Sequence, residues 1–160
     1  MSEFLTQSEG EIVSSALYPS YFPQEQESAM QKHKVAVYGS LLSGFGNHTY
    51  FLEGNATKLS ETKTASDEYV MVSLGGFPGV IDCTSEAKGK ILVEIYEVDS
   101  ETLRRLDGLE GHPNFYERKL IDFEDGTTAW MYIYQGSRGG AIEKDSNGDY
   151  SWRKHYAKRK

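Results

Sequence analysis

The chain has 160 residues, 38% of them hydrophobic, which is enough for one domain with a buried core and argues against a second. No run of about 20 apolar residues could span a bilayer, and the acidic N-terminus does not resemble a secretory signal, so we expect a cytoplasmic protein with no membrane partner. A net charge of −7 argues against nucleic acid as a partner. The single cysteine, Cys83, excludes an internal disulfide, and we expect it to be a small buried side chain.

The two ends of the chain differ from its middle. Residues 1–33 show no sustained periodicity, and Pro19 and Pro23 interrupt any helix or strand there, so we interpret them as an N-terminal extension. The domain itself is expected at 34–152. The strongly basic residues 153–160 are interpreted as a solvated C-terminal tail, with contact to an anionic partner as the alternative. Either end could bind a protein partner.

From residue 34 the sequence changes to short β-type runs separated by glycine. In the last run, Ala129, Met131 and Ile133 alternate with aromatic residues, so both faces of that strand should be covered. This pattern is typical of a barrel wall or of a sheet beneath a helix. The predicted strands are 34–38, 68–74, 80–83, 90–98, 115–123 and 127–135.

One helix is predicted at 100–109, directly after a strand. Asp99 or Ser100 would cap its N-terminus by accepting a hydrogen bond from a free backbone N–H. Gly111 can adopt the left-handed conformation that ends a helix, and Pro113 prevents continuation.

Glu110, at the end of this helix, is the first candidate functional residue. It follows Leu103 and Leu106 at the spacing i, i+3, i+7, so a helix that buries its leucines should point Glu110 toward the same protected face. Burial and the negative end of the helix dipole would both raise the pKa of its carboxyl toward neutrality. The alternative is a frayed last turn, with Glu110 in water or paired with Arg118.

The second candidate is the turn Tyr38-Gly39-Ser40-Leu41 after the first strand. A strand that leads into a glycine-containing turn exposes backbone N–H groups, which can hold a carboxylate or a phosphate. The neighbouring glycines fit neither the dinucleotide fingerprint nor the P-loop, and no GxSxG sequence surrounds Ser40, so nucleotide binding and serine hydrolysis are not supported.

The remaining polar candidates are interpreted more simply. The four histidines lack the spacing of a helical metal pair, so no metal site is predicted, and His48 and His112 are interpreted as hydrogen-bonded packing residues. Glu94 is a rival carboxylate, because it alternates with apolar residues; a paired charge is the preferred interpretation. Tyr116 could donate a hydrogen bond to a ligand or brace the wall of a cavity.

Several motifs, taken in order, resemble the γ-glutamylcyclotransferase-like family, which includes γ-glutamylamine cyclotransferases and AIG2-like proteins. The resemblance covers about 34–152 and excludes the N-terminal extension. The segments that carry it are VAVYGSL (35–41), GNH (46–48), FPGV (77–80), GKILVEIYEV (89–98), LDGLEGHPNFYER (106–118), WMYIY (130–134) and GDYSW (148–152).

The resemblance implies an α+β fold, a small mixed β-barrel with flanking short helices, with a pocket at the barrel mouth and no metal or organic cofactor. It maps the family's catalytic glutamate onto Glu110 and its substrate-binding turn onto Tyr38, Gly39, Ser40 and Leu41. The implied activity is cyclisation of a small-molecule γ-glutamyl amine or γ-glutamyl amino acid to 5-oxoproline, with release of the amine and Glu110 as general acid and base.

Two points stay open at this stage. A non-catalytic protein could keep the same fold and use it to bind a small ligand or a protein partner, because fold does not determine function. Leu42 and Ser43 also stand where many members of the family have a basic residue, so the leaving group of the substrate is not predicted.

Overall fold

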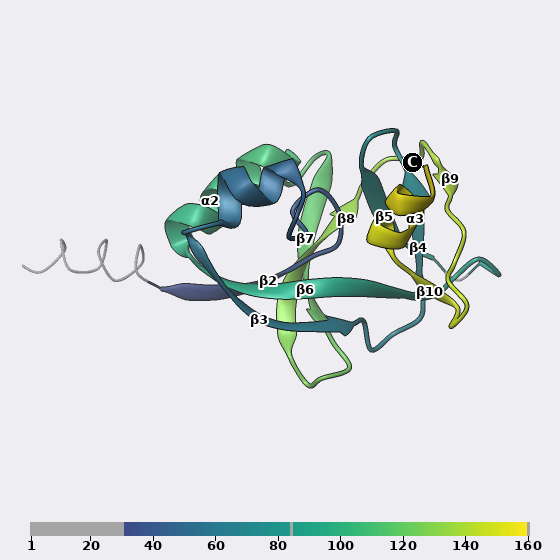
Figure 1. The fold of residues 1–160 in the computed structure, drawn as a ribbon, viewed down its shortest axis with the longest axis horizontal. Helices are drawn as coiled ribbons and strands as arrows, with labels where there is room; N and C mark the ends of the chain where they lie inside the picture. Colours follow the sequence, from purple (N-terminus) through teal and green to yellow (C-terminus); the bar gives the residue numbers. More distant parts are fainter. Residues whose placement is uncertain (1–30, 84, 160) are drawn as a thin grey trace, which may run out of the picture. The chain divides into compact units, whose positions relative to one another are not determined.

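The computed structural model describes residues 31–83 and 85–159 (Figure 1). The chain divides into two units, Met1–Gln31 and Lys32–Lys160. All but the last residue of the first unit lies outside the described residues, so the assignment of an N-terminal extension stays a prediction. The elements described below belong to the second unit.

A six-stranded mixed sheet is centred on the long strand β6. Strands β2 and β3 pair with β6 antiparallel, and the short β10 pairs with it in parallel. Strand β2 also pairs in parallel with β8, whose antiparallel neighbour is β7. The strands are β2 (Lys32–Val37), β3 (Ala56–Lys63), β6 (Lys90–Asp99), β7 (Tyr116–Asp122), β8 (Thr128–Tyr134) and β10 (Asp149–Tyr150).

A second, three-stranded antiparallel sheet has the order β5-β4-β9. Its strands are β5 (Pro78–Asp82), β4 (Tyr69–Ser73) and β9 (Gly140–Ala141). Four of the five residues of β4 are buried, and strand β5 contacts β8, which brings the two sheets together around one hydrophobic core.

The mixed α+β class is confirmed, but the predicted barrel is wrong: in the part of the chain that the structure describes, neither sheet closes on itself. The barrel was implied by the family resemblance, whereas the covered faces of β8 fit a barrel wall and a sheet beneath a helix equally well. Met131 and Tyr132, on opposite faces of β8, are both buried, and the Tyr132 hydroxyl donates to Asp107 on the adjacent helix α2. The second interpretation therefore holds.

Helix α2 (Ser100–Glu110) forms as predicted. The Asp99 side chain caps it, accepting a hydrogen bond from the Thr102 N–H at 2.8 Å, and Gly111 ends it with φ 65°. Figure 1 shows α2 lying beside the short π-helical turn η1 (His48–Leu52), with both over β2 and β6.

Helix α3 (Trp152–Arg159) occupies the segment that was expected to be a solvated chain end. Its first residue, Trp152, is 1% exposed, and the ring of Tyr156 packs edge-on against Phe45 with centroids 5.2 Å apart. These two aromatic residues are one helical turn apart and share a face, so the segment docks although most of its side chains are charged. None of the described helices is long and apolar enough to cross a membrane.

Candidate active site

A cavity of about 360 Å³ opens where α2, the turn after β2 and the start of β5 meet. It contains every residue that the sequence analysis assigned to the site. The described residues that line it are Ala36, Val37, Tyr38, Gly39, Ser40, Leu41, Asn47, Gly76, Phe77, Pro78, Leu109, Glu110, Phe115, Tyr116 and Tyr132.

The turn after β2 is held tightly against the start of β5. A Cβ atom on Gly39 would lie 2.7 Å from two ring carbons of Pro78, so only glycine fits at this position. The turn closes with a hydrogen bond of 2.9 Å from the Leu42 N–H to the Gly39 carbonyl oxygen, and the Asn47 side chain donates to the Ser40 hydroxyl at 2.8 Å.

The backbone N–H groups of this turn are available to a ligand. Within residues 31–83 and 85–159, the N–H groups of Gly39, Ser40 and Leu41 have no hydrogen-bond acceptor. Buried N–H groups without partners are rare in proteins, and a set of adjacent ones forms a concave site for an anion. The arrangement can therefore bind a carboxylate.

Glu110, the last residue of α2, is half-buried in the same cavity. Burial raises the pKa of its carboxyl to about 7. Glu110 does not form the alternative ion pair with Arg118. The Arg118 Nε instead donates to Asp107 Oδ1 at 2.8 Å. At neutral pH Glu110 can therefore both accept and donate a proton.

Three tyrosine side chains surround Glu110 without donating to it. Burial first, with the charge of Glu110 as a smaller contribution, raises the pKa of Tyr38, Tyr116 and Tyr132. Their hydroxyls are already used elsewhere, which leaves the carboxylate without a donor among the described residues. The acceptors are the Tyr132 carbonyl oxygen for Tyr38, the Pro78 carbonyl oxygen for Tyr116 and Asp107 Oδ1 for Tyr132, at 2.6, 2.6 and 2.7 Å.

Glu94 does not line this cavity; it anchors the loop that follows the turn. It is 5% exposed and accepts hydrogen bonds from the Ser43 N–H at 2.9 Å and from the Tyr96 hydroxyl at 2.9 Å. Arg153 on α3 forms an ion pair with it at 2.9 Å. Burial opposes ionisation, but the hydrogen bonds from Ser43 and Tyr96 and the charge of Lys58 outweigh it and lower the pKa of Glu94. The preferred interpretation of Glu94 as a paired charge is confirmed.

The histidines named from the sequence are hydrogen-bonded, as expected. His48 Nδ1 donates to the Leu41 carbonyl oxygen at 3.0 Å, which braces the turn, and His112 Nδ1 accepts from the Arg118 N–H at 3.1 Å. Cys83 is half-buried rather than buried. No group of three His, Cys, Asp or Glu side chains among the described residues could hold a metal ion.

The fold and cavity define a class of small α+β proteins with solved members. The chain is similar to a mouse AIG2-like protein, at 25% identity and a TM-score of 0.56, over 68% of this chain and 80% of that one. It is also similar to an uncharacterized protein of Pyrococcus horikoshii, at 27% identity and a TM-score of 0.62, over 79% and 95% of the two chains.

Residues 35–154 match the family described as "Gamma-glutamyl cyclotransferase, AIG2-like", and the chain belongs to this family. A relative from Methanocaldococcus jannaschii, named "Putative gamma-glutamylcyclotransferase", is 38% identical over 120 residues, which cover 72% of this chain and 96% of the relative. The resemblance inferred from the sequence motifs is thereby confirmed.

Proposed function

We propose that the protein cyclises a γ-glutamyl amine or γ-glutamyl amino acid to 5-oxoproline and releases the amine. Membership of the family supports a γ-glutamyl small molecule as the substrate. The observation that carries the proposal is that Glu110, whose pKa is raised to about 7, shares one cavity with three backbone N–H groups that have no acceptor in the described chain.

The turn binds the end that all γ-glutamyl compounds share. Their α-carboxylate would be costly to bury without hydrogen bonds, and the N–H groups of Gly39, Ser40 and Leu41 supply them. A carboxylate bound there would leave the α-amine in the same cavity as Glu110, which lines it. The tyrosine hydroxyls do not compete for Glu110, because each already donates to another acceptor.

The reaction then needs one proton to be moved twice. Glu110 takes a proton from the α-amine as its nitrogen attacks the γ-carbonyl carbon, which forms the C–N bond of the five-membered ring. The bond between the γ-carbon and the leaving nitrogen breaks, and Glu110 returns the proton to that nitrogen. Nucleophile and electrophile belong to one molecule, so holding the chain folded supplies much of the rate enhancement.

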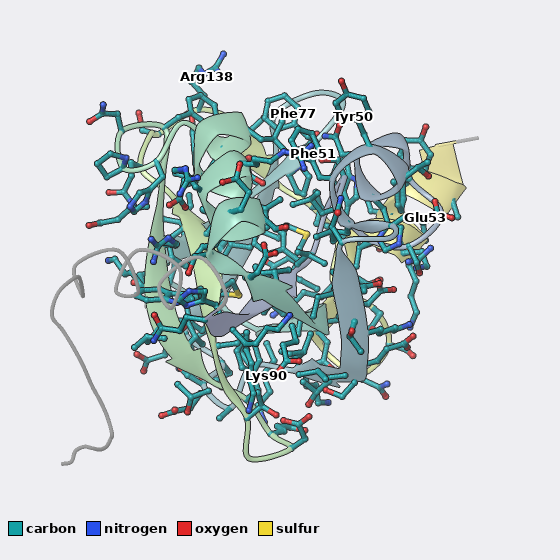
Figure 2. The ribbon with its side chains drawn as sticks, turned by 90° about the vertical axis from the view of Figure 1, so that its left-hand side faces the viewer. Tyr50, Phe51, Glu53, Phe77, Lys90 and Arg138 are labelled. Atoms are coloured by element: carbon teal, nitrogen blue, oxygen red, sulfur yellow. The ribbon has the colours of Figure 1, made fainter. Side chains whose placement is uncertain are left out.

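The test is an assay for 5-oxoproline with a panel of γ-glutamyl amino acids, γ-glutamyl-ε-lysine and glutathione. We expect product with the wild-type protein and a loss of at least about 100-fold in kcat for Glu110→Gln, the usual size of a general acid-base contribution. The matched control is Glu53→Gln, since Glu53 is exposed and lies outside the cavity (Figure 2).

Two results would overturn the proposal. Unchanged turnover in Glu110→Gln would remove Glu110 from the mechanism. No product from the wild-type protein with any member of the panel would favour a protein that uses the same cavity only to bind its ligand.

A further inference from the structure

Asp107, one turn before Glu110 on α2, carries a carboxyl group that the proposed mechanism does not use. Its Oδ1 atom accepts two hydrogen bonds, from the Arg118 Nε at 2.8 Å and from the Tyr132 hydroxyl at 2.7 Å. The side chains of Asp107 and Arg118 are each only 20% exposed, so water screens this ion pair less than it would a surface pair. We call Asp107, Arg118 and Tyr132 the Asp107 cluster.

The sheet holds the two donors of the Asp107 cluster in place. Arg118 on β7 and Tyr132 on β8 stand directly opposite each other in the antiparallel ladder, so their side chains leave the sheet on the same face. Trp130, two residues before Tyr132, also points to that face. The guanidinium carbon of Arg118 lies 4.3 Å from the centre of the Trp130 ring, which supports it from the side. Both donors therefore reach the end of α2 from fixed positions.

Glu110 lies close to the same donors. Asp107 and Glu110 are three residues apart on one helix, and such residues are neighbours on its surface, with Cβ atoms about 5–6 Å apart. Tyr132 lines the Glu110 cavity, and the charge of Glu110 adds to burial and to Asp107 in raising the pKa of Tyr132. Two carboxyl groups one turn apart thus compete for one pair of donors, and Asp107 holds both.

Asp107 differs from the other acceptors around Glu110. Tyr38 after β2 and Tyr116 on β7 also line the cavity, and their hydroxyls donate to backbone carbonyl oxygens. Tyr132 is the member of this trio whose hydroxyl donates to a side chain. A single substitution at position 107 can therefore release the Tyr132 hydroxyl, whereas no substitution removes a backbone carbonyl.

Other cations near the end of α2 do not face Glu110 in the cavity. Arg104 forms an ion pair with Glu101, and the guanidinium carbon of Arg105 lies 5.5 Å from the centre of the Phe51 ring. Arg138, in the loop after β8, does not line the cavity. Arg118 is thus the cation that its contact with Asp107 places nearest to the last turn of α2 among those described.

We propose that Asp107 is a positioning residue, which holds the Arg118 and Tyr132 donors and thereby keeps Glu110 without a hydrogen-bond partner. This inference rests on the proposed function for the use of a free Glu110, whereas the contacts that carry it do not depend on a substrate. A carboxylate that accepts hydrogen bonds or pairs with a cation is stabilised in its charged form and becomes a weaker base. Asp107 thus preserves the capacity of Glu110 to exchange a proton near neutrality.

Asp107→Ala releases both donors, and the Glu110 carboxyl reports their arrival. Its carbon NMR resonance in the labelled full-length protein, assigned by its absence from Glu110→Gln, is followed from about pH 4 to about pH 9. We expect a pKa of about 7 in the wild-type protein, and a fall of at least about one pH unit in Asp107→Ala. The control is Asp82→Ala, which removes an exposed carboxylate outside the cavity, 3.8 Å from Lys119, and should leave the pKa of Glu110 unchanged.

Removing the released donors should reverse the change. We expect the pKa of Glu110 to return most of the way to its wild-type value when Arg118→Met and Tyr132→Phe are added to Asp107→Ala, and each double variant shows which donor moves. A substitution that merely loosened α2 would not be repaired by two further losses of contact. If Asp107→Ala does not fold, Asp107→Asn, which keeps the size of the side chain and releases Arg118 from its ion pair, is measured against the same expectations.

Two results would overturn the inference: an unchanged pKa of Glu110 in the Asp107 variant, or a fall that persists after both donors are removed. Turnover separates these from a failure of the proposed function. In assays of 5-oxoproline, the acid limb of the kcat profile should move down with the pKa of Glu110, since it reports the essential base of the complex. A limb that stays while the NMR midpoint moves, or an absence of product, contradicts the proposed function and leaves the role of Asp107 supported by the midpoint.

Discussion

The raised pKa of Glu110 makes a prediction about stability that needs no substrate. The pKa is about 7 in the folded protein and about 4.5 for an ordinary glutamate. Between these values the folded state holds a proton that the unfolded state has released. The free energy of unfolding therefore falls as the pH rises through this range. Glu110→Gln keeps the size of the side chain and removes this dependence.

The expected magnitude follows from the two pKa values. At 1.36 kcal/mol per pH unit, the span from 4.5 to about 7 corresponds to about 3 kcal/mol. This is an upper limit, because Glu110 is only half-buried and water reaches part of its carboxyl. The difference in unfolding free energy, wild type minus Glu110→Gln, should fall by up to about 3 kcal/mol and be constant above about pH 8.

Urea unfolding followed by tryptophan fluorescence, at intervals from about pH 4.5 to pH 8.5, measures this difference. Glu53→Gln is again the control, and its difference from wild type should not vary over the same range, because Glu53 is exposed. A difference for Glu110→Gln that is flat, or that rises with pH, would show that the carboxyl is not held in a desolvating environment, and the assignment of Glu110 as a proton carrier would lose its physical basis.

Three further substitutions test the framework of the site. Gly39→Ala places a methyl group against Pro78, and we expect about 1–3 kcal/mol of destabilisation together with a raised KM; a normal KM in steady-state assays would show that the turn does not hold the substrate. Glu94→Gln should lower the free energy of unfolding, measured by urea unfolding, by about 1–2 kcal/mol. This loss should shrink as the pH falls through the lowered pKa of Glu94 in the folded state, and a loss that grows in acid would contradict the pairing of Glu94. Trp152→Ala should lower the free energy of unfolding by about 3–5 kcal/mol, whereas a change within about 0.5 kcal/mol would mean that α3 is not docked.

The sequence predicted the elements whose signal is local. All six predicted strands form with ends shifted by two residues or fewer, and α2 has the predicted cap and terminal glycine. Strand β3 was missed because its sequence, ATKLSETK, has no apolar alternation. It forms by backbone pairing along β6, and all of its residues are exposed or half-buried. The two-residue strands β9 and β10 are too short for any periodic signal.

The candidate site also has one feature that the local sequence predicts and another that it does not. The direction of Glu110 followed from its spacing to Leu103 and Leu106, which are buried as expected. The lack of a hydrogen-bond donor to Glu110 could not be predicted, because it depends on the acceptors that the Tyr38 and Tyr132 hydroxyls find. These acceptors are 94 residues away in the sequence for Tyr38 and 25 residues away for Tyr132. No local pattern reports such distant pairs.

The pairing of Glu94 with Arg153 makes the final helix a structural support of the loop that follows the turn after β2. Glu94 holds Ser43, two residues beyond the turn, and Arg153 holds Glu94 from α3. The energetic coupling can be quantified by a double-mutant cycle between positions 94 and 153, read out in KM rather than in stability. A sequence alignment that trimmed α3 as a variable terminus would discard a residue that contacts Ser43, in the loop after the turn, more than one hundred positions earlier in the chain.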